Sequence, residues 1–297
     1  MGLISLFQKS AFWFLLITIL INFSCKKDDT SGIPSYVKIN EIRVETDFKK
    51  EGSASSNIAD AWFYETGNHL GVFELPAEIP VLKSGNTDLT VFGGVKRSGI
   101  SSLRHAYPFY TAFEMDTLLV EEQTITIQPV LRYKESTTFA WIEDFDDLSI
   151  SMDTAYGSKV GITRVNNSDS TFEGKGSFGA FMDSEHNYFM GHSTEKFSLP
   201  RNGEDVYLEF DYKTDKLIQL HILIYTTSGG SFLIPVQVVN PKINDKGENV
   251  WNKMYSYLTP YVSSNLEAYQ FQIYFESWTA ADETSTYFML DNVKLVY

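Results

Sequence analysis

Residues 206–212, Val-Tyr-Leu-Glu-Phe-Asp-Tyr, are the stretch that decides the fold. The even positions are apolar or aromatic, whereas the odd positions hold Tyr207, Glu209 and Asp211. Successive side chains of an extended chain point to opposite sides, so this alternation predicts a strand with one face in a core. Tyr207, Glu209 and Asp211 would then line the outer face of the sheet.

Two later stretches repeat this alternation. Residues 218–225 place aliphatic side chains at every even position, and residues 270–276 place Phe, Ile and Phe at the odd positions. The remaining positions hold amides, a carboxylate, a histidine and tyrosines, with Leu223 among them, so we predict that the three strands share one polar face. Its candidate ligand-binding residues are Tyr207, Glu209, Gln219, His221, Tyr225, Gln272, Tyr274 and Glu276.

The rest of the chain also favours strands. Aromatic residues make up 15% of the sequence, and ring side chains favour strands. No segment has a long apolar stripe of period 3.6, so the spacing predicts antiparallel sandwiches instead of alternating strands and helices. The other predicted strands are 36–44 (with a bulge at Asn40-Glu41), 59–64, 70–75, 89–95, 107–113, 124–133, 178–182, 232–239 and 287–296.

A polar segment from Lys134 to Thr138 separates these runs into two sets. We therefore predict an all-β protein with two β-sandwich domains, over residues 35–135 and 136–297. A hydrophobic fraction of 43% is sufficient for two cores of this size.

The N-terminus begins with a run of another kind. Residues 11–23 are mostly apolar, and Lys9 is the only charge before them. A membrane-spanning helix needs roughly 20 apolar residues, whereas this run stops at Ser24-Cys25. We therefore predict a cleaved signal peptide over residues 1–24 in preference to an uncleaved anchor helix.

Cys25 is the only cysteine of the chain, so it cannot form an intrachain disulfide. Ser24-Cys25 resembles the lipobox of bacterial lipoproteins, although Asn22 stands where an aliphatic residue is usual. The Lys-Lys-Asp-Asp that follows resembles the export signal of surface lipoproteins in the Bacteroidota. The resemblance implies lipid on Cys25, a tether over residues 25–34 and a position at the cell surface on the outer membrane.

The charge balance restricts the partners. The formal net charge is -14, from 24 basic and 38 acidic residues. An acidic body argues against nucleic acid and against docking on anionic lipid. We therefore expect contact with the membrane only through the N-terminal lipid.

The second set of strands opens with Glu143-Asp144-Phe145 and closes with residues 287–295, Tyr-Phe-Met-Leu-Asp-Asn-Val-Lys-Leu. Together with residues 206–212, these strand edges resemble the carbohydrate-binding-like jelly rolls of the galactose-binding type. The resemblance covers the last half of the chain and implies a jelly roll. Similar domains often hold a structural calcium between their first and last strands, which implies Glu143, Asp144 and Asp291 as candidate ligands.

The predicted polar face suits sugars, because rings stack on a pyranose while amides and carboxylates bond its hydroxyls. The same face could equally be the solvated side of an ordinary antiparallel sheet. Trp251, in a loop expected over residues 242–260, and Trp278, before another loop, are further candidates for contact with a ligand or partner. Both indoles could also fold back onto the core.

The sequence contains no common catalytic motif. It lacks Gly-x-Ser-x-Gly, His-Glu-x-x-His and a glycine-rich phosphate loop, and its five histidines match no usual zinc spacing. We therefore predict a non-catalytic protein without a cofactor beyond the calcium. The first hypothesis is a surface lipoprotein that binds polysaccharide for a neighbouring transporter or enzyme. The second is a structural or accessory subunit of an outer-membrane complex, and the third is a hydrolase whose acidic pair is distant in sequence.

Overall fold

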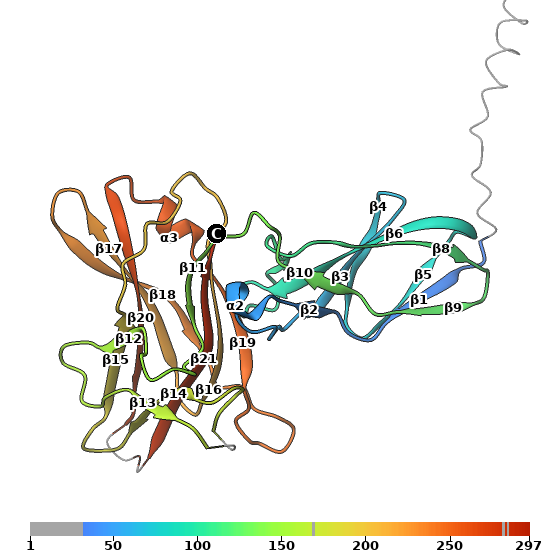
Figure 1. Cartoon of the computed structure of the whole chain (residues 1–297). Coiled ribbons are helices and arrows are strands. Elements are labelled where there is room, and N and C mark those ends of the chain that lie inside the picture. Colours follow the sequence, from blue (N-terminus) through green and yellow to red (C-terminus); the bar gives the residue numbers. More distant parts are fainter. Residues whose placement is uncertain (1–31, 168–169, 281–282, 284) are drawn as a thin grey trace, which may run out of the picture.

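The residues that the computed structural model describes are 32–167, 170–280, 283 and 285–297. Cys25 and the predicted signal peptide over residues 1–24 lie outside them. Within the described part of the chain, no helix is long and apolar enough to cross a membrane. Strands dominate and form two adjacent modules (Figure 1), here the N-module (residues 35–133) and the C-module (residues 139–296).

The N-module is a sandwich of one five-stranded sheet on two smaller sheets. The five-stranded sheet has the order β4 (Asn68–Glu74), β3 (Asp60–Glu65), β6 (Gly85–Lys96) and β7 (Arg104–Ala106), with β8 (Phe113–Leu119) also on β6. The opposing sheets are β5 (Ala77–Val81), β1 (Ser35–Ile39) and β9 (Thr124–Ile127), and β10 (Val130–Arg132) with β2 (Arg43–Glu45). Alternate residues fill the core, and Phe63 and Val91 are fully buried in it.

Two strand pairs of the N-module are parallel, which corrects the purely antiparallel sandwich that we expected. β1 pairs in parallel with β9, and β2 pairs in parallel with β10. The bulge predicted at Asn40-Glu41 is a full break, because the chain leaves one sheet after Ile39 and enters another at Arg43. A matching break lies between β9 and β10, which pair with β1 and β2. Pro129 stands at this break, and because it has no backbone N–H it cannot donate to a neighbouring strand.

The C-module is a sandwich of two antiparallel sheets. The six-stranded sheet has the order β13 (Thr163–Val165), β14 (Ser177–Met182), β21 (Thr286–Val296), β16 (Tyr207–Thr214) and β19 (Asn252–Tyr257), with β11 (Phe139–Glu143) also on β21. The five-stranded sheet has the order β12 (Met152–Thr154), β15 (Tyr188–Ser193), β20 (Ala268–Trp278), β17 (Ile218–Thr226) and β18 (Ser231–Val239). The two short helices of the chain's described part are α2 (Phe48–Glu51) and α3 (Thr259–Ser263).

The chain crosses repeatedly between the two sheets of the C-module, as in a jelly roll: β14, β16, β19 and β21 lie in one sheet and β15, β17, β18 and β20 in the other. Phe178, Phe189 and Phe288 pack against one another between the sheets, with ring centroids 5.3 to 6.0 Å apart. The predictions of an all-β chain, two sandwiches and a C-terminal jelly roll are confirmed.

The six-stranded sheet of the C-module faces the N-module, and the five-stranded sheet faces away from it (Figure 1). Tyr207 of β16 and Tyr255 of β19 belong to the same buried cluster as the N-module core. Their rings lie 5.2 and 4.9 Å from the ring of Tyr107, centroid to centroid. The two modules therefore meet through a buried aromatic interface, which we call the module junction.

Two local predictions were wrong at this junction. Residues 107–113 do not form a strand: Tyr107, Phe109 and Tyr110 pack into the junction from the segment between β7 and β8. Residues 252–257, expected in a loop, form β19. The buried Lys253, the second residue of β19, removed the apolar signal that a strand in this position would normally show.

Candidate functional site

The outer face of the five-stranded sheet, which we call the sheet face, carries six of the predicted ligand-binding side chains. The alternate residues of β17 and β20 fill the core, so the others must face outward. The register places Tyr274 between His221 on one neighbour and His192 on the other. The six residues are Gln219, His221 and Tyr225 on β17 and Gln272, Tyr274 and Glu276 on β20.

β15 adds Tyr188 and His192 to the sheet face, and sequence analysis missed this strand. Its outward positions include the apolar Met190, and Gly191 stands at an inward position. Neither residue fits the rule of apolar inside and polar outside, so β15 had no clear alternation to detect.

Glu276 is the centre of the first hydrogen-bonded group on the sheet face. Its carboxylate accepts from the Tyr188 hydroxyl at 2.9 Å and lies 2.6 Å from His221 Nε2. Burial, together with Glu276, raises the pKa of Tyr188 to about 12. The Tyr188 hydroxyl therefore keeps its proton at neutral pH and holds the carboxylate in place.

Tyr225 and Gln272 form the second group. The Tyr225 hydroxyl donates to Gln272 Oε1 at 2.8 Å, and the Gln272 amide donates to a backbone carbonyl of β15 at 2.5 Å. The Lys196 ammonium lies 3.9 Å from the centre of the Tyr225 ring and covers one side of it. The Tyr274 ring packs against His192 with 4.9 Å between centroids. Each ring is thus held by a neighbour and remains only half-buried.

The arrangement offers ring surfaces and hydrogen-bonding groups side by side. Tyr225 pairs with Gln270 and His221 with Tyr274, so the two tyrosines are four positions apart along the sheet. At about 3.4 Å per residue the backbone positions are about 14 Å apart along the strands. The Tyr225 side chain reaches back toward Tyr274, because its hydroxyl bonds Gln272.

Tyr207 and Glu209 do not belong to the sheet face, so the prediction that three strands share one face is wrong. β16 lies in the other sheet, and both residues are fully buried at the module junction. The Glu209 carboxylate accepts hydrogen bonds from Tyr107 at 2.6 Å and from Tyr133 at 2.8 and 2.9 Å. Alternation identified the correct side of β16 but could not show that another module covers it.

Charged side chains around Glu209 form a group that we call the junction cluster: Glu209, Asp211, Lys253, Asp291 and Lys294, all buried. Lys253 Nζ lies 3.7 Å from Glu209 and 3.6 Å from Asp211. Lys294 Nζ donates to an N-module backbone carbonyl at 2.5 Å, and burial lowers its pKa to about 8. Burial also raises the pKa of Asp291 to about 7. Sequence reasoning missed the two lysines, because nothing in a strand pattern shows a buried charge.

The two tryptophans have different surroundings. Trp251 is half-buried and packs on Phe172, with 5.3 Å between ring centroids, so it folds back onto the C-module. Trp278, at the end of β20, is 46% exposed. With Leu217 and Pro241 it lines a surface cavity of about 440 Å³.

The carboxylates expected to hold calcium make other contacts. Glu143 accepts from the backbone N–H of Phe145 at 2.9 Å, and Asp144 accepts from that of Asp146 at 3.1 Å. Asp291 accepts from the Ser177 hydroxyl at 2.5 Å. Within the residues that the structure describes, no three His, Cys, Asp or Glu side chains are grouped so as to hold a metal ion. The calcium site stays a prediction without support from these positions.

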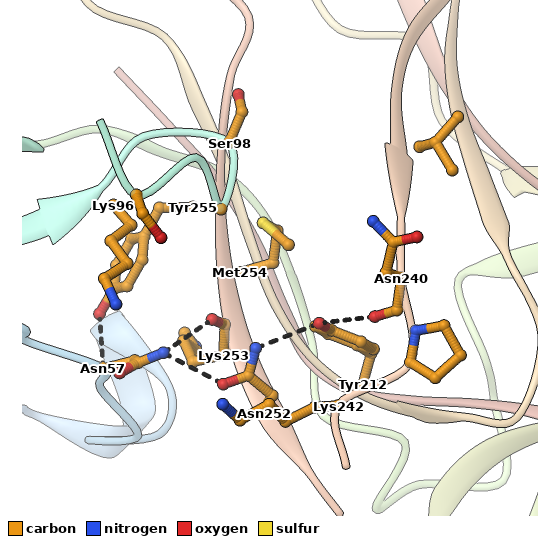
Figure 2. Close-up of a pocket in the computed structure, with 14 residues that line it drawn as sticks. Asn57, Lys96, Ser98, Tyr212, Asn240, Lys242, Asn252, Lys253, Met254 and Tyr255 are labelled. Atoms are coloured by element: carbon orange, nitrogen blue, oxygen red, sulfur yellow. Dashed lines mark hydrogen bonds between the residues drawn. The ribbon is translucent and has the colours of Figure 1, made fainter. Parts of the chain in front are cut away.

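A polar cavity of about 260 Å³, which we call the junction cavity, lies where the modules meet. Figure 2 shows a chain of hydrogen bonds along it. Asn57 Nδ2 donates to Asn252 Oδ1, Asn252 Nδ2 donates to the Tyr212 hydroxyl, and Tyr212 donates to the Asn240 carbonyl, each at 3.1 Å. Sequence analysis did not predict this cavity, whose walls come from distant segments.

No protein-family model and no curated protein sequence matches the chain. Among solved structures, a xylan-binding module of family 22 from Paenibacillus barcinonensis Xyn10C is 14% identical, with a TM-score of 0.38 over 55% of this chain and 96% of its own. The family 11 carbohydrate-binding module of the Clostridium thermocellum cellulase Lic26A-Cel5E is 15% identical, with a TM-score of 0.32 over 53% and 95%. A carbohydrate-binding module of the β-sandwich superfamily is 12% identical, with a TM-score of 0.36 over 80% and 85%. Similarities at this level assign neither a family nor a ligand to the chain.

Proposed function

We propose that this protein binds a polysaccharide through the sheet face of its C-module. The observation that carries the proposal is the group of half-buried rings of Tyr188, Tyr225 and Tyr274 around the Gln272 amide and the Glu276 carboxylate. Rings offer apolar surface to a pyranose, and the Glu276 carboxylate can accept hydrogen bonds from its hydroxyls. The buried Gln272 amide is fully hydrogen-bonded within the protein and holds the Tyr225 ring in place. Hydrogen bonds within the face hold these side chains before a ligand arrives, which reduces the entropy lost on binding.

The proposal assigns no catalytic role to the sheet face. The Glu276 carboxylate is engaged by Tyr188 and His221, so its part is to position those side chains and to accept hydrogen bonds. Together with the lack of catalytic motifs, this supports a binding protein that needs no cofactor.

The test is a screen of the full-length chain, purified in detergent, against a glycan array and bacterial polysaccharides. Tyr225→Ala and Tyr274→Ala should each weaken saturable binding at least tenfold, because each removes one ring platform. Tyr36→Ala is the matched control, since Tyr36 is a partly exposed tyrosine on β1 of the N-module. Binding retained in both variants, or no binding across a broad panel, would overturn the proposal.

We also propose that lipid on Cys25 anchors the protein at the outer surface of the outer membrane, as in the surface lipoproteins that residues 24–29 resemble. In Figure 1 the described chain enters the N-module at the end remote from the C-module. The N-module would then act as a spacer that holds the sheet face away from the membrane. Incorporation of an alkyne-tagged fatty acid, lost in Cys25→Ser, and protease cleavage on intact cells test the lipid and the surface position separately.

A second candidate function is that of an accessory subunit in an outer-membrane complex with a transporter. The exposed Trp278, beside Leu217 and the largely apolar cavity that both line, is the observation that favours it. Exposed aromatic side chains next to a cavity are common anchors of protein interfaces. Crosslinking on intact cells should then give a defined adduct that Trp278→Ser abolishes and Trp251→Ser does not; a chain that stays monomeric without adducts would exclude this function.

A further inference from the structure

We infer that the junction cavity is a second saccharide subsite, specific for a sugar that carries an anionic carboxylate or sulfate group. The inference rests on the proposed glycan binding and extends it to a second place on the molecule. The cavity lies between the N-module and the two edge strands β18 and β19 of the C-module, whereas the hydrogen-bonded groups of the sheet face lie on β15, β17 and β20.

The charge of the lining is the first observation. Lys96, Lys242 and Lys253 line the cavity, and none of its lining residues is Asp or Glu, although the whole chain has a net charge of -14. Lys253 is paired with the buried carboxylates of the junction cluster. Lys96 and Lys242 make no ion pair within 4.0 Å to any residue that the structure describes. Lys96 acts electrostatically on the buried Asp60 carboxylate, whose close ion pair is with Arg104. Neither the Lys96 nor the Lys242 ammonium group is engaged in an ion pair that would have to break before it meets an anion.

The hydrogen-bonding groups of the lining point to the same kind of ligand. Along the chain of Figure 2, the acceptors Asn252 Oδ1, Tyr212 Oη and the Asn240 carbonyl are already used inside the protein. Ser98 Oγ accepts from the backbone N–H of Tyr257, which leaves the Ser98 hydroxyl proton available. The same three bonds use Asn57 Nδ2, Asn252 Nδ2 and the Tyr212 hydroxyl as donors. The Ser98 hydroxyl and the ammonium groups of Lys96 and Lys242 are further donors of the lining, and an acidic sugar supplies acceptor oxygens for them.

The size of the cavity limits the ligand to a small unit. A volume of about 260 Å³ corresponds to about nine waters at roughly 30 Å³ each. This suits one monosaccharide and excludes a folded partner. Asn57, Lys96 and Ser98 come from the N-module, and Asn240 and Lys242 come from the C-module, so a bound sugar would contact both modules at once.

The experiment measures binding of the full-length protein in detergent to three probes by calorimetry: a galacturonate trisaccharide, a sulfated disaccharide and sodium sulfate. The variants are Lys96→Gln, Lys242→Gln and the double variant. Lys246→Gln is the matched control, because Lys246 is exposed on the loop between β18 and β19 and does not line the cavity. Tyr225→Ala reports on the sheet face in the same titrations.

The expected result is saturable binding of at least one acidic sugar that weakens about tenfold in each lysine variant, about a hundredfold in the double variant and not in Lys246→Gln. This binding should persist in Tyr225→Ala, which separates it from the sheet face. Sodium sulfate should compete only weakly; competition as strong as that of the sugars would reduce the site to an anion site and overturn the saccharide assignment. Acidic sugars that bind equally to all lysine variants, or that do not bind while neutral glycans do, would overturn the inference and leave the proposed function standing.

Discussion

The two outer surfaces of the C-module have the same sequence pattern and opposite environments. On the sheet face, Tyr225, Tyr274 and Glu276 alternate with core residues and are partly exposed on an uncovered side of the sandwich. On the other surface, Glu209, Asp211 and Lys294 alternate with core residues in the same way and are fully buried. Alternation therefore identifies which side chains of a strand point away from the core of their own module. It does not show whether those side chains meet solvent or are covered by another module.

The two surfaces also differ in what their polar groups contact. Glu276 bonds residues of its own sheet, whereas Glu209 accepts from Tyr107 and Tyr133 of the N-module. A buried charge without partners costs several kcal/mol, so partners from a second module are required at the junction. The junction cluster therefore couples the docking of the two modules to the stability of the C-module, and the sheet face does not.

The largest expected difference between the surfaces is the effect of removing their central carboxylates. Glu209→Ala leaves the Lys253 ammonium and two buried hydroxyls with fewer partners, which should lower the free energy of unfolding by about 3–5 kcal/mol. Glu276→Ala, on a face open to solvent, should lower it by about 1 kcal/mol. Urea unfolding of both variants measures the contrast, and equal losses would show that the two surfaces are energetically alike.

The second difference is in the pH dependence of stability. The folded-state pKa of Asp291 is raised to about 7 from an ordinary 3.8, so between about pH 4 and 7 the folded chain holds a proton that the unfolded chain releases. This raised pKa stabilises the fold at low pH, and the contribution is lost as the pH rises through about 7. The free energy of unfolding should therefore fall between about pH 4 and 7, and Asp291→Asn should remove part of this fall. The part removed is about 4 kcal/mol at most, because the pKa of Asp291 is raised by about three units.

Unfolding free energies of Asp291→Asn and the unchanged chain, measured from pH 4 to 8, check this prediction. Lys294 affects stability in the opposite direction and at higher pH. Because its pKa is lowered to about 8, the free energy of unfolding should rise again between about pH 8 and 10.5. Parallel curves for Asp291→Asn and the unchanged chain would contradict the burial of an ionisable Asp291.

A smaller contrast is expected from single hydroxyls. Tyr107→Phe removes a fully buried bond to the Glu209 carboxylate and should cost about 2 kcal/mol. Tyr188→Phe removes the corresponding bond to Glu276, whose side chain is 22% exposed, and should cost less than about 1 kcal/mol. Thermal and urea unfolding of the two variants measure these losses. A larger loss of unfolding free energy in Tyr188→Phe than in Tyr107→Phe would contradict the prediction that hydrogen bonds at the junction contribute more to stability.

The smallest expected effect concerns Lys196, whose ammonium covers one side of the Tyr225 ring. Lys196→Ala should change the free energy of unfolding by about 0.5–1 kcal/mol, as is usual for an exposed cation–π contact. Glycan affinity should fall less than in Tyr225→Ala, because the ring itself remains. A loss of affinity equal to that of Tyr225→Ala would show that the ammonium, and not the ring, makes the main contact.

Sequence reasoning located the sheet face through β17 and β20, whose inward residues are all aliphatic or aromatic. It failed at β15, where Met190 and Gly191 stand at positions that blur the alternation, and at β19, where Lys253 lies inside the junction. The junction cavity could not be predicted from the sequence for another reason. Its walls come from residues 57, 96–101, 212, 238–242 and 252–255, which only the docking of two modules brings together.

The sequence by itself determined that the chain is all-β and that β17 and β20 carry an outward polar row, because side-chain periodicity is a local property of an extended chain. The jelly roll of the second half followed from the resemblance of its strand edges to a known type of domain, and the lipid anchor at Cys25, in a short linear motif, stays a prediction. Only the tertiary structure decided that Tyr207 and Glu209 are buried while Tyr225 and Glu276 are not. The Tyr107–Glu209 hydrogen bond joins residues 102 positions apart, and burial at such a contact depends on how the two modules dock.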